Sequence, residues 1–193
     1  MELGITKQKA DELVEKYITK PITKLHCIES EAIMKAMAKR FGENEEGWGI
    51  LGLLHDIDWD LAEGDSKKHC GLMVDILKDA GGTDFLVETI VSHGYGFDCG
   101  APGGKERETK IQHALASAET LTGLIVASAL MQPDKKLASV SLQSLQKKFK
   151  NKKFAAGCKR EIILECEKSG IPLDEFLELG LKALQEIHEK LGL

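Results

Sequence analysis

Residues 48 to 58 place two metal-ligand side chains at the end of a strongly apolar stretch. The segment reads Trp-Gly-Ile-Leu-Gly-Leu-Leu-His-Asp-Ile-Asp, so His55 and Asp56 follow directly on a run suited to burial. Burying such a pair without a compensating partner is costly. Other residues of the same chemistry occur at helix-sized intervals: His26, His69, His93 and Glu119. This order predicts a metal centre assembled from several helices.

The spacing of apolar residues is helical throughout, with glycine and proline between the periodic segments and no strand-like alternation. We therefore predict an all-α fold. The expected helices cover about residues 6–18, 23–41, 45–54, 66–79, 84–91, 106–131, 140–150, 155–168 and 173–191. His26 would then lie in the opening turn of one helix and His69 near the start of another. Glu119 is the only formally charged residue between Lys110 and Asp134.

Length, charge and cysteine usage limit the class of protein. A chain of 193 residues suits one domain, which would bury about 70% of the unfolded chain's surface. The formal charge of -5 argues against a nucleic-acid binder. The five cysteines are odd in number and include no Cys-x-x-Cys pair, which fits a reducing cytoplasm. No signal pattern and no apolar run of about 20 residues are apparent, so we expect a cytoplasmic protein without a membrane partner.

Imidazole and carboxylate groups are the usual protein ligands of zinc, iron, manganese and nickel, and a carboxylate can bridge two ions. Asp56 is the natural bridge. We expect one ion at His26, His55, Asp56 and Glu119, and a second at Asp56, His69 and His93. Such sites leave coordination positions open for water and substrate, as catalytic centres do.

Each of these residues also has an ordinary structural interpretation. A histidine taken alone is more often a surface or hydrogen-bonded core residue than a ligand. Glu119 has two alternatives, which are an ion pair with a lysine and a place on a solvated stripe of its helix. His188 lies on a polar terminal segment and is not a candidate.

Several neighbouring polar residues are expected to have no role in the centre. Asp58 and Asp60 are expected to face solvent in a loop. His113 lies six residues before Glu119, about 120° away around the helix, and is expected on the surface. Cys70 is expected to be a packing residue, because neighbouring helical residues diverge by about 100°.

The ordered ligand set resembles the HD superfamily of metal-dependent phosphohydrolases. The signature of that family is a histidine, a later His-Asp pair and a final aspartate on successive helices. The residues that match, within about residues 20–130, are His26, the string Leu-Leu-His55-Asp56-Ile57 and Glu119. His69 and His93 match two further histidines of the members that are similar in having a dinuclear centre.

The resemblance implies an HD-domain-like helical bundle with the metal site between its helices. Residues 1–193 would form a single domain, with the metal-binding core at about 20–130 and a C-terminal helical extension at about 135–193. One or two divalent ions are implied as cofactors, from among zinc, manganese, nickel, magnesium and iron. Glu119 departs from the family, which has aspartate there. Gly94-Tyr95-Gly96 is not the Gly-Tyr-Pro signature of cyclic-dinucleotide enzymes, so that activity is not assigned.

The resemblance favours a hydrolase that uses metal-activated water to cleave a phosphate ester such as a nucleotide, with Asp56 as the catalytic bridge. Basic residues near the ligands in sequence are candidates for phosphate contacts: Lys67, Lys68, Lys105, Arg107 and Lys110. Two alternatives are a mixed-valent di-iron oxygenase of the same superfamily and a non-catalytic ligand-binding HD module. The expected partner is a small phosphorylated molecule, and the sequence does not indicate the oligomeric state.

Overall fold

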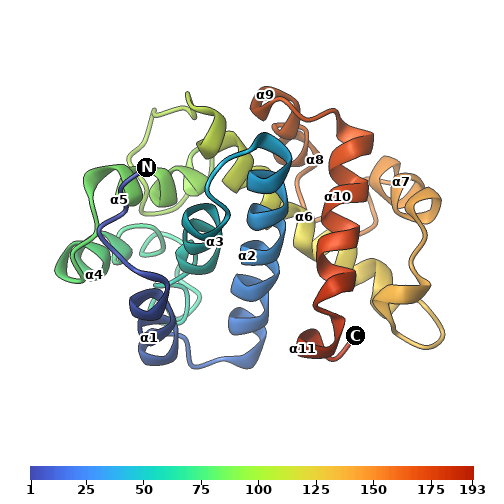
Figure 1. Cartoon of the computed structure of the whole chain (residues 1–193), viewed down its shortest axis with the longest axis horizontal. Helices are drawn as coiled ribbons and strands as arrows, with labels where there is room; N and C mark the ends of the chain where they lie inside the picture. The colour runs from blue at the N-terminus through green and yellow to red at the C-terminus, as the bar shows by residue number, and fades with distance from the viewer.

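The computed structural model describes residues 1–193, and its regular elements are all helices (Figure 1). The all-α fold expected from the sequence is confirmed. Its α-helices are α1 (Lys7–Tyr17), α2 (Pro21–Phe41), α3 (Glu45–Leu54), α4 (Met73–Asp79), α5 (Asp84–Val91), α6 (Lys110–Leu130), α7 (Leu142–Lys150), α8 (Arg160–Ile163), α9 (Cys166–Ser169), α10 (Leu173–Glu186) and α11 (His188–Leu191). Two short 3-10 helices are η1 (Ser92–Gly94) and η2 (Leu137–Ser139).

α2 occupies the middle of the molecule, with α3 on one side and α10 on the other (Figure 1). It begins at Pro21, whose fixed φ suits the first helical position. Its contact with α3 depends on Gly52, because a Cβ atom there would lie 2.6 Å from the backbone oxygen of Ser30. This close approach brings His26 of α2 beside His55, the residue that follows α3.

α6 is the main core helix behind α2. Thr109 and Gln112 form a capping box at its start, in which each side chain bonds the other residue's backbone N–H. By length and composition alone α6 is apolar enough to cross a membrane, yet 72% of its most apolar window is buried inside the protein. It packs against α2, α7, α8, α9 and α10, so its side chains contribute to the hydrophobic core.

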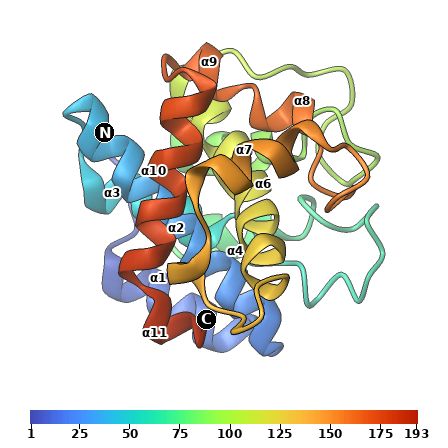
Figure 2. The ribbon, with the colours of Figure 1, turned by 90° about the vertical axis from the view of Figure 1, so that its right-hand side faces the viewer.

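The helices that follow α6 join the same core. α10 packs on both α2 and α6, and Figure 2 shows α7 in front of α6 with α10 to one side. One continuous apolar cluster includes Met37 of α2, Leu121 of α6 and Phe176 of α10. Gly180 permits the close approach of α10 to α6, because a Cβ atom there would lie 2.6 Å from Leu121 Cδ2. The core of residues 20–130 and the C-terminal extension therefore share one apolar interior.

Two of the expected helices around the candidate ligands begin later than the sequence pattern indicates. Residues 66–72 form turns and α4 begins only at Met73, so the prediction of a helix from Ser66 is wrong and His69 does not lie on a helix. α6 begins at Lys110 rather than near residue 106, because the capping box ends the preceding loop.

The helix expected over residues 155–168 is also wrong. Residues 152–157 form turns, and only the short helices α8 and α9 follow. The guanidinium group of Arg160 is buried among these turns and donates to the carbonyl oxygens of Phe149, Phe154 and Cys158. Carbonyl groups satisfied by a side chain do not need helical partners, which allows the chain to turn here.

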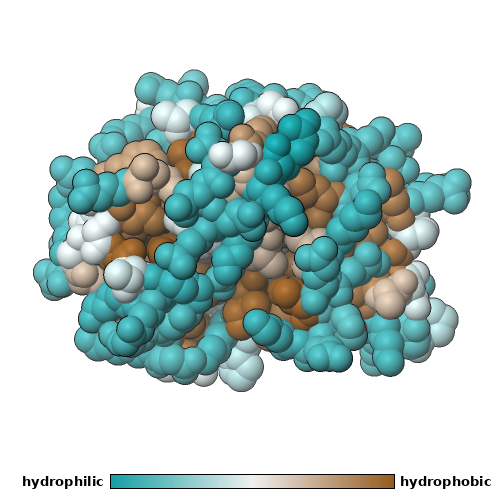
Figure 3. Space-filling view, viewed as in Figure 1, coloured by the Kyte–Doolittle hydropathy of each residue, from teal (hydrophilic) through white to brown (hydrophobic).

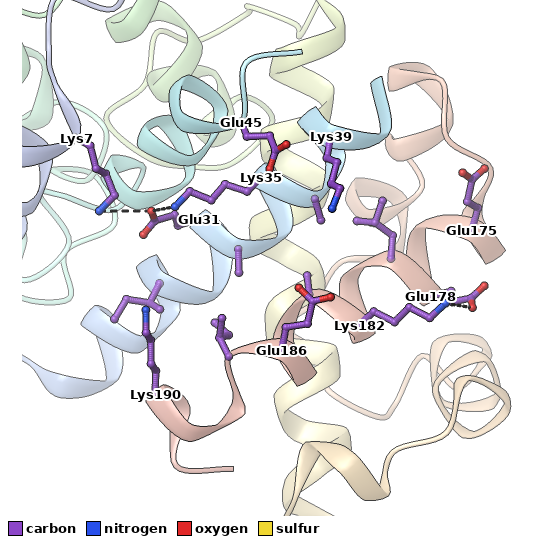
Figure 4. A pocket seen from close by; sticks show the side chains of 16 residues that line it. Lys7, Glu31, Lys35, Lys39, Glu45, Glu175, Glu178, Lys182, Glu186 and Lys190 are labelled. Atoms are coloured by element: carbon purple, nitrogen blue, oxygen red, sulfur yellow. Dashed lines mark hydrogen bonds and ion pairs between the residues drawn. The ribbon is translucent and has the colours of Figure 1, made fainter. Parts of the chain in front are cut away.

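A groove of about 640 Å³ lies on the surface along the line where α2 meets α10 (Figure 4). Figure 3 shows hydrophobic residues exposed between rows of hydrophilic ones on this face. Five lysines and five glutamates line the groove, and some of them pair, with Lys35 2.5 Å from Glu31 and Lys182 2.6 Å from Glu178. None of the candidate metal ligands lines it, so this groove is separate from the candidate metal centre.

Candidate metal centre

Four histidines from separate segments point the same ring nitrogen at Asp56. The four are His26 of α2, His55 at the end of α3, His69 in the turns before α4 and His93 in η1. Their Nε2 atoms lie 3.5 to 3.6 Å from the carboxylate oxygens of Asp56. The structure therefore brings together five of the six residues that the sequence pattern singles out.

The Asp56 carboxylate lies between two pairs of histidines. Its Oδ2 atom is 3.6 Å from His26 Nε2, and its Oδ1 atom is 3.5 Å from the Nε2 atoms of His55, His69 and His93. Within the pairs, the two Nε2 atoms are 3.1 Å apart for His26 and His55 and 3.0 Å apart for His69 and His93. Asp56 thus has a carboxylate oxygen within 3.6 Å of every ring in both pairs, a position from which it could bridge two ions.

The second ring nitrogen of His55 and of His93 is bonded to an acceptor. His55 Nδ1 lies 2.8 Å from the carbonyl oxygen of Gly52, and His93 Nδ1 lies 2.6 Å from that of Ile90. A carbonyl oxygen can only accept, so both Nδ1 atoms carry a proton and donate it. The Nε2 atom of each neutral ring is left with a lone pair.

The same argument applies to the other two histidines. His69 Nδ1 donates to the carboxylate of Asp58 at 2.8 Å. His26 Nδ1 lies 3.0 Å from the hydroxyl oxygen of Thr122, which donates its own proton to the carbonyl oxygen of Glu119 at 2.7 Å. The Thr122 hydroxyl therefore accepts from His26, and in the neutral form of both rings the lone pair is on Nε2.

Four Nε2 atoms and one carboxylate consequently converge on one small volume, and each neutral ring would present its Nε2 lone pair there. Two lone pairs that face each other at 3.0 to 3.1 Å repel unless a proton or a cation lies between them. Neutral imidazoles oriented by a hydrogen bond from the other nitrogen are the usual arrangement of metal-binding histidines. The residues present therefore fit one or two divalent metal ions.

Burial and the charge of Asp56 set the electrostatics of the cluster. Burial lowers the pKa of His26 and that of His55, the latter to about 3, which favours neutral rings. Burial also lowers the pKa of His69, but Asp58 and its other neighbours outweigh burial and raise that pKa to about 9. For Asp56, burial raises the pKa, but His55 and the other rings outweigh burial and hold the pKa well below its usual range.

Glu119, the sixth candidate, lines a cavity beside the histidines. It belongs to neither group of possible metal ligands, which are His26, His55 and Asp56 in one and His69, Cys70 and His93 in the other. Its side chain is half-buried and accepts a hydrogen bond from the Thr120 hydroxyl. Burial raises its pKa to about 7. No lysine pairs with this carboxyl group, so the ion-pair alternative for Glu119 does not occur.

The expectation that Asp58 and Asp60 face solvent is wrong, since both are buried. Asp58 accepts from His69 Nδ1 and, through its other oxygen, from the backbone N–H of Met73 at 2.9 Å, where α4 begins. Asp60 accepts from the backbone N–H of Thr19 and that of Lys20, both at 2.7 Å, at the start of α2. The two carboxylates therefore tie the loop after His55-Asp56 to the helices around it.

The expected surface position of His113 is also wrong. His113 is buried and its Nδ1 atom lies 2.6 Å from Glu165, which also accepts two hydrogen bonds from Arg107, at 2.6 and 2.7 Å. The same guanidinium group donates to the carbonyl oxygens of Ser92 and Tyr95, both at 2.8 Å. This buried ion pair therefore holds the backbone on both sides of His93.

The candidate centre opens into a cavity of about 620 Å³. Its lining includes four of the candidate ligands together with Glu119, and it includes the side chains of Trp59 and Phe97. None of the five basic residues proposed to contact phosphate lines it. Arg107 is engaged by Glu165, and the Lys110 ammonium lies 4.3 Å from the centre of the Phe41 ring.

No protein-family model, no curated protein and no solved structure matches this chain. The assignment of the site therefore rests on the geometry and chemistry of its own residues.

Proposed function

We propose that the protein is a metal-dependent phosphohydrolase that cleaves a small phosphate ester such as a nucleotide. One observation supports this above all, namely the convergence of four histidine Nε2 atoms on the Asp56 carboxylate beside an open cavity. A structural metal site is closed by its protein ligands, whereas a centre beside a cavity leaves positions for water and substrate. The sequence resemblance to the HD superfamily supports the same reaction class.

The protein's own residues would position the reaction. When bound, divalent ions lower the pKa of a coordinated water and offset the charge of the phosphate. Asp56 has carboxylate oxygens 3.5 to 3.6 Å from the Nε2 atoms of both histidine pairs and would therefore be the ligand that two ions share. Asp58 and Thr122 hold the rings of His69 and His26 with Nε2 free, which keeps these ligands oriented before substrate arrives.

The cavity lining also restricts the substrate. It contains no lysine or arginine, so the negative charge of a phosphate would be offset by metal ions rather than by side chains. The acidic Asp98 and Glu119 on the lining favour a substrate with one phosphate over one with several. Trp59 and Phe97 offer aromatic faces to the organic part of the ester.

The test combines metal analysis with turnover. Wild-type protein and Asp56→Asn are purified without added metal, their metal content is measured, and each is assayed against a panel of phosphate monoesters and nucleotides. We expect wild type to bind up to two ions and release phosphate, and Asp56→Asn to lose metal and activity together. Iron with oxygen uptake upon addition of a substrate would favour the di-iron oxygenase instead. Tight nucleotide binding without turnover would favour a ligand-binding module.

A further inference from the structure

Cys70 lies inside the histidine cluster, although its sequence position beside His69 suggests a packing residue. Its side chain is fully buried, and its Sγ atom lies 3.7 Å from His93 Nε2. Residues 66–72 form turns rather than a helix, so the divergence of about 100° between helical neighbours does not apply. His69 and Cys70 can therefore direct adjacent side chains at the same point.

The backbone of Cys70 adopts an uncommon conformation to reach this position. Its φ is 68°, in the left-handed region. Glycine adopts this region freely, but residues with a side chain, apart from Asn and Asp, rarely do. Such conformations persist where the surrounding structure requires them, and they cluster at functional sites.

Gly94 leaves the space that the sulfur fills. A Cβ atom at Gly94 would lie 2.5 Å from Cys70 Sγ and 2.8 Å from Cys99 Sγ. Cys99 is differently engaged, because its thiol donates to the carbonyl oxygen of Gly94 at 3.3 Å. Of the two thiols, only Cys70 belongs with His69 and His93 to a group of possible metal ligands.

The distances around Cys70 have the proportions of a tetrahedral site. Bonds of about 2.0 Å to nitrogen or oxygen and about 2.3 Å to sulfur separate the ligand atoms of a tetrahedron by about 3.3 to 3.6 Å. Here His69 Nε2 and His93 Nε2 are 3.0 Å apart, each lies 3.5 Å from Asp56 Oδ1, and Cys70 Sγ lies 3.7 Å from His93 Nε2. The ligand atoms of His69, Cys70 and His93 all lie within 4.8 Å of one another, so one ion could contact these three, and Asp56 Oδ1 lies beside both histidines.

We propose that Cys70 is a thiolate ligand of the second metal ion, in a set with His69, His93 and Asp56. A thiolate favours zinc or iron(II) over magnesium or manganese at this position. The other ion, at His26 and His55, has only nitrogen and oxygen ligands from this chain. The inference rests on the proposed metal centre, but it does not depend on which reaction the centre performs.

The test is reconstitution of the metal-free protein with cobalt(II), which reports thiolate ligation by a ligand-to-metal charge-transfer band in the near ultraviolet. The informative variant is Cys70→Gly, because glycine adopts the left-handed φ without strain while the substitution removes the thiol together with its Cβ atom. The matched control is Cys99→Ser, which alters the neighbouring thiol that is not a proposed ligand. Thermal unfolding of both metal-free variants checks that they fold.

We expect the band in wild type and in Cys99→Ser, and its loss in Cys70→Gly. We also expect the affinity of Cys70→Gly for the second ion to fall by more than the roughly 10- to 100-fold typical of losing an outer hydrogen-bond partner. A band that persists in folded Cys70→Gly, or two bound cobalt ions in wild type without the band, would overturn the inference. The band without phosphate release from any ester would contradict the proposed reaction and leave Cys70 as a ligand.

Discussion

Replacing Asp58 with asparagine perturbs the candidate metal ligand His69 without altering any of the atoms that would contact a metal ion. Asp58 is fully buried and receives two hydrogen bonds, one from His69 Nδ1 at 2.8 Å and one from the Met73 backbone N–H at 2.9 Å. Both partners are donors, whereas an asparagine side chain has one acceptor oxygen and one donor NH2 group. Asp58→Asn therefore satisfies only one of these two donors.

Either orientation of the new amide has a measurable cost. If its NH2 group faces His69, the ring proton moves to Nε2, which then cannot bind a metal. If its NH2 group faces Met73, two donors meet inside the protein, at a cost of about 1–3 kcal/mol in the free energy of unfolding. Loss of an outer partner of a ligating histidine typically weakens metal affinity about 10- to 100-fold, which corresponds to about 1.4–2.7 kcal/mol.

The affinity is measured by competition with a chromophoric chelator, and the occupancy of the second ion is followed by tryptophan fluorescence. Trp59 suits this readout because its ring centre lies 4.8 Å from that of His69. The control is Asp60→Asn, a second buried carboxylate-to-amide change in the same loop that should lower the melting temperature without changing second-ion affinity. Wild-type affinity for both ions in Asp58→Asn would refute the tautomer argument.

Three further outcomes follow from buried groups elsewhere. Arg107→Met should lower the free energy of unfolding in urea by about 3–5 kcal/mol because it leaves the Glu165 carboxylate with His113 alone and without the guanidinium group, and a double variant with Glu165→Leu should recover much of this loss; no recovery would argue against a pairing effect. Gly52→Ala should cost about 1–3 kcal/mol, measured in the same way, because its Cβ atom would meet Ser30 O at 2.6 Å, and an unchanged midpoint would contradict that contact. Burial raises the pKa of Glu29 from 4.5 to about 7, so the folded protein retains a proton that the unfolded chain releases, and stability should fall as pH rises through that window. Compared with wild type, Glu29→Gln should remove a decline on the order of 3 kcal/mol between pH 4.5 and pH 8, whereas equal pH slopes in urea titrations would show that Glu29 is not buried in its neutral form.

The helices were predictable wherever apolar periodicity and end signals agree. The segment expected at residues 45–54 is α3 with the same bounds, since Asn44 caps its start and the apolar run ends at His55. The segment after Asp65 was not predictable in this way. A cap residue and an apolar repeat suggest a helix from Ser66, but Asp58 bonds Met73 N–H from a distant part of the loop and the helix begins there.

The residues that orient the candidate ligands carried a weaker sequence signal than the ligands themselves. Asp58 lies two residues after Asp56, with the apolar Ile57 between them, and this spacing could have suggested a buried role. Thr122 has no such signal, because a threonine in a core helix usually bonds only the carbonyl oxygen one turn before it. Its contact with His26 joins residues 96 positions apart.

By itself, the sequence determined that the chain is helical and that His55 and Asp56 end a buried helix, because both follow from local spacing and from the cost of burying polar groups. Only the tertiary structure decided which nitrogen of each histidine is free. The proton of an imidazole lies on the nitrogen that meets an acceptor, and these acceptors are Gly52, Asp58, Ile90 and Thr122. Tertiary packing likewise turned Cys70 toward the cluster, because the turns at residues 66–72 release it from the geometry of a helix.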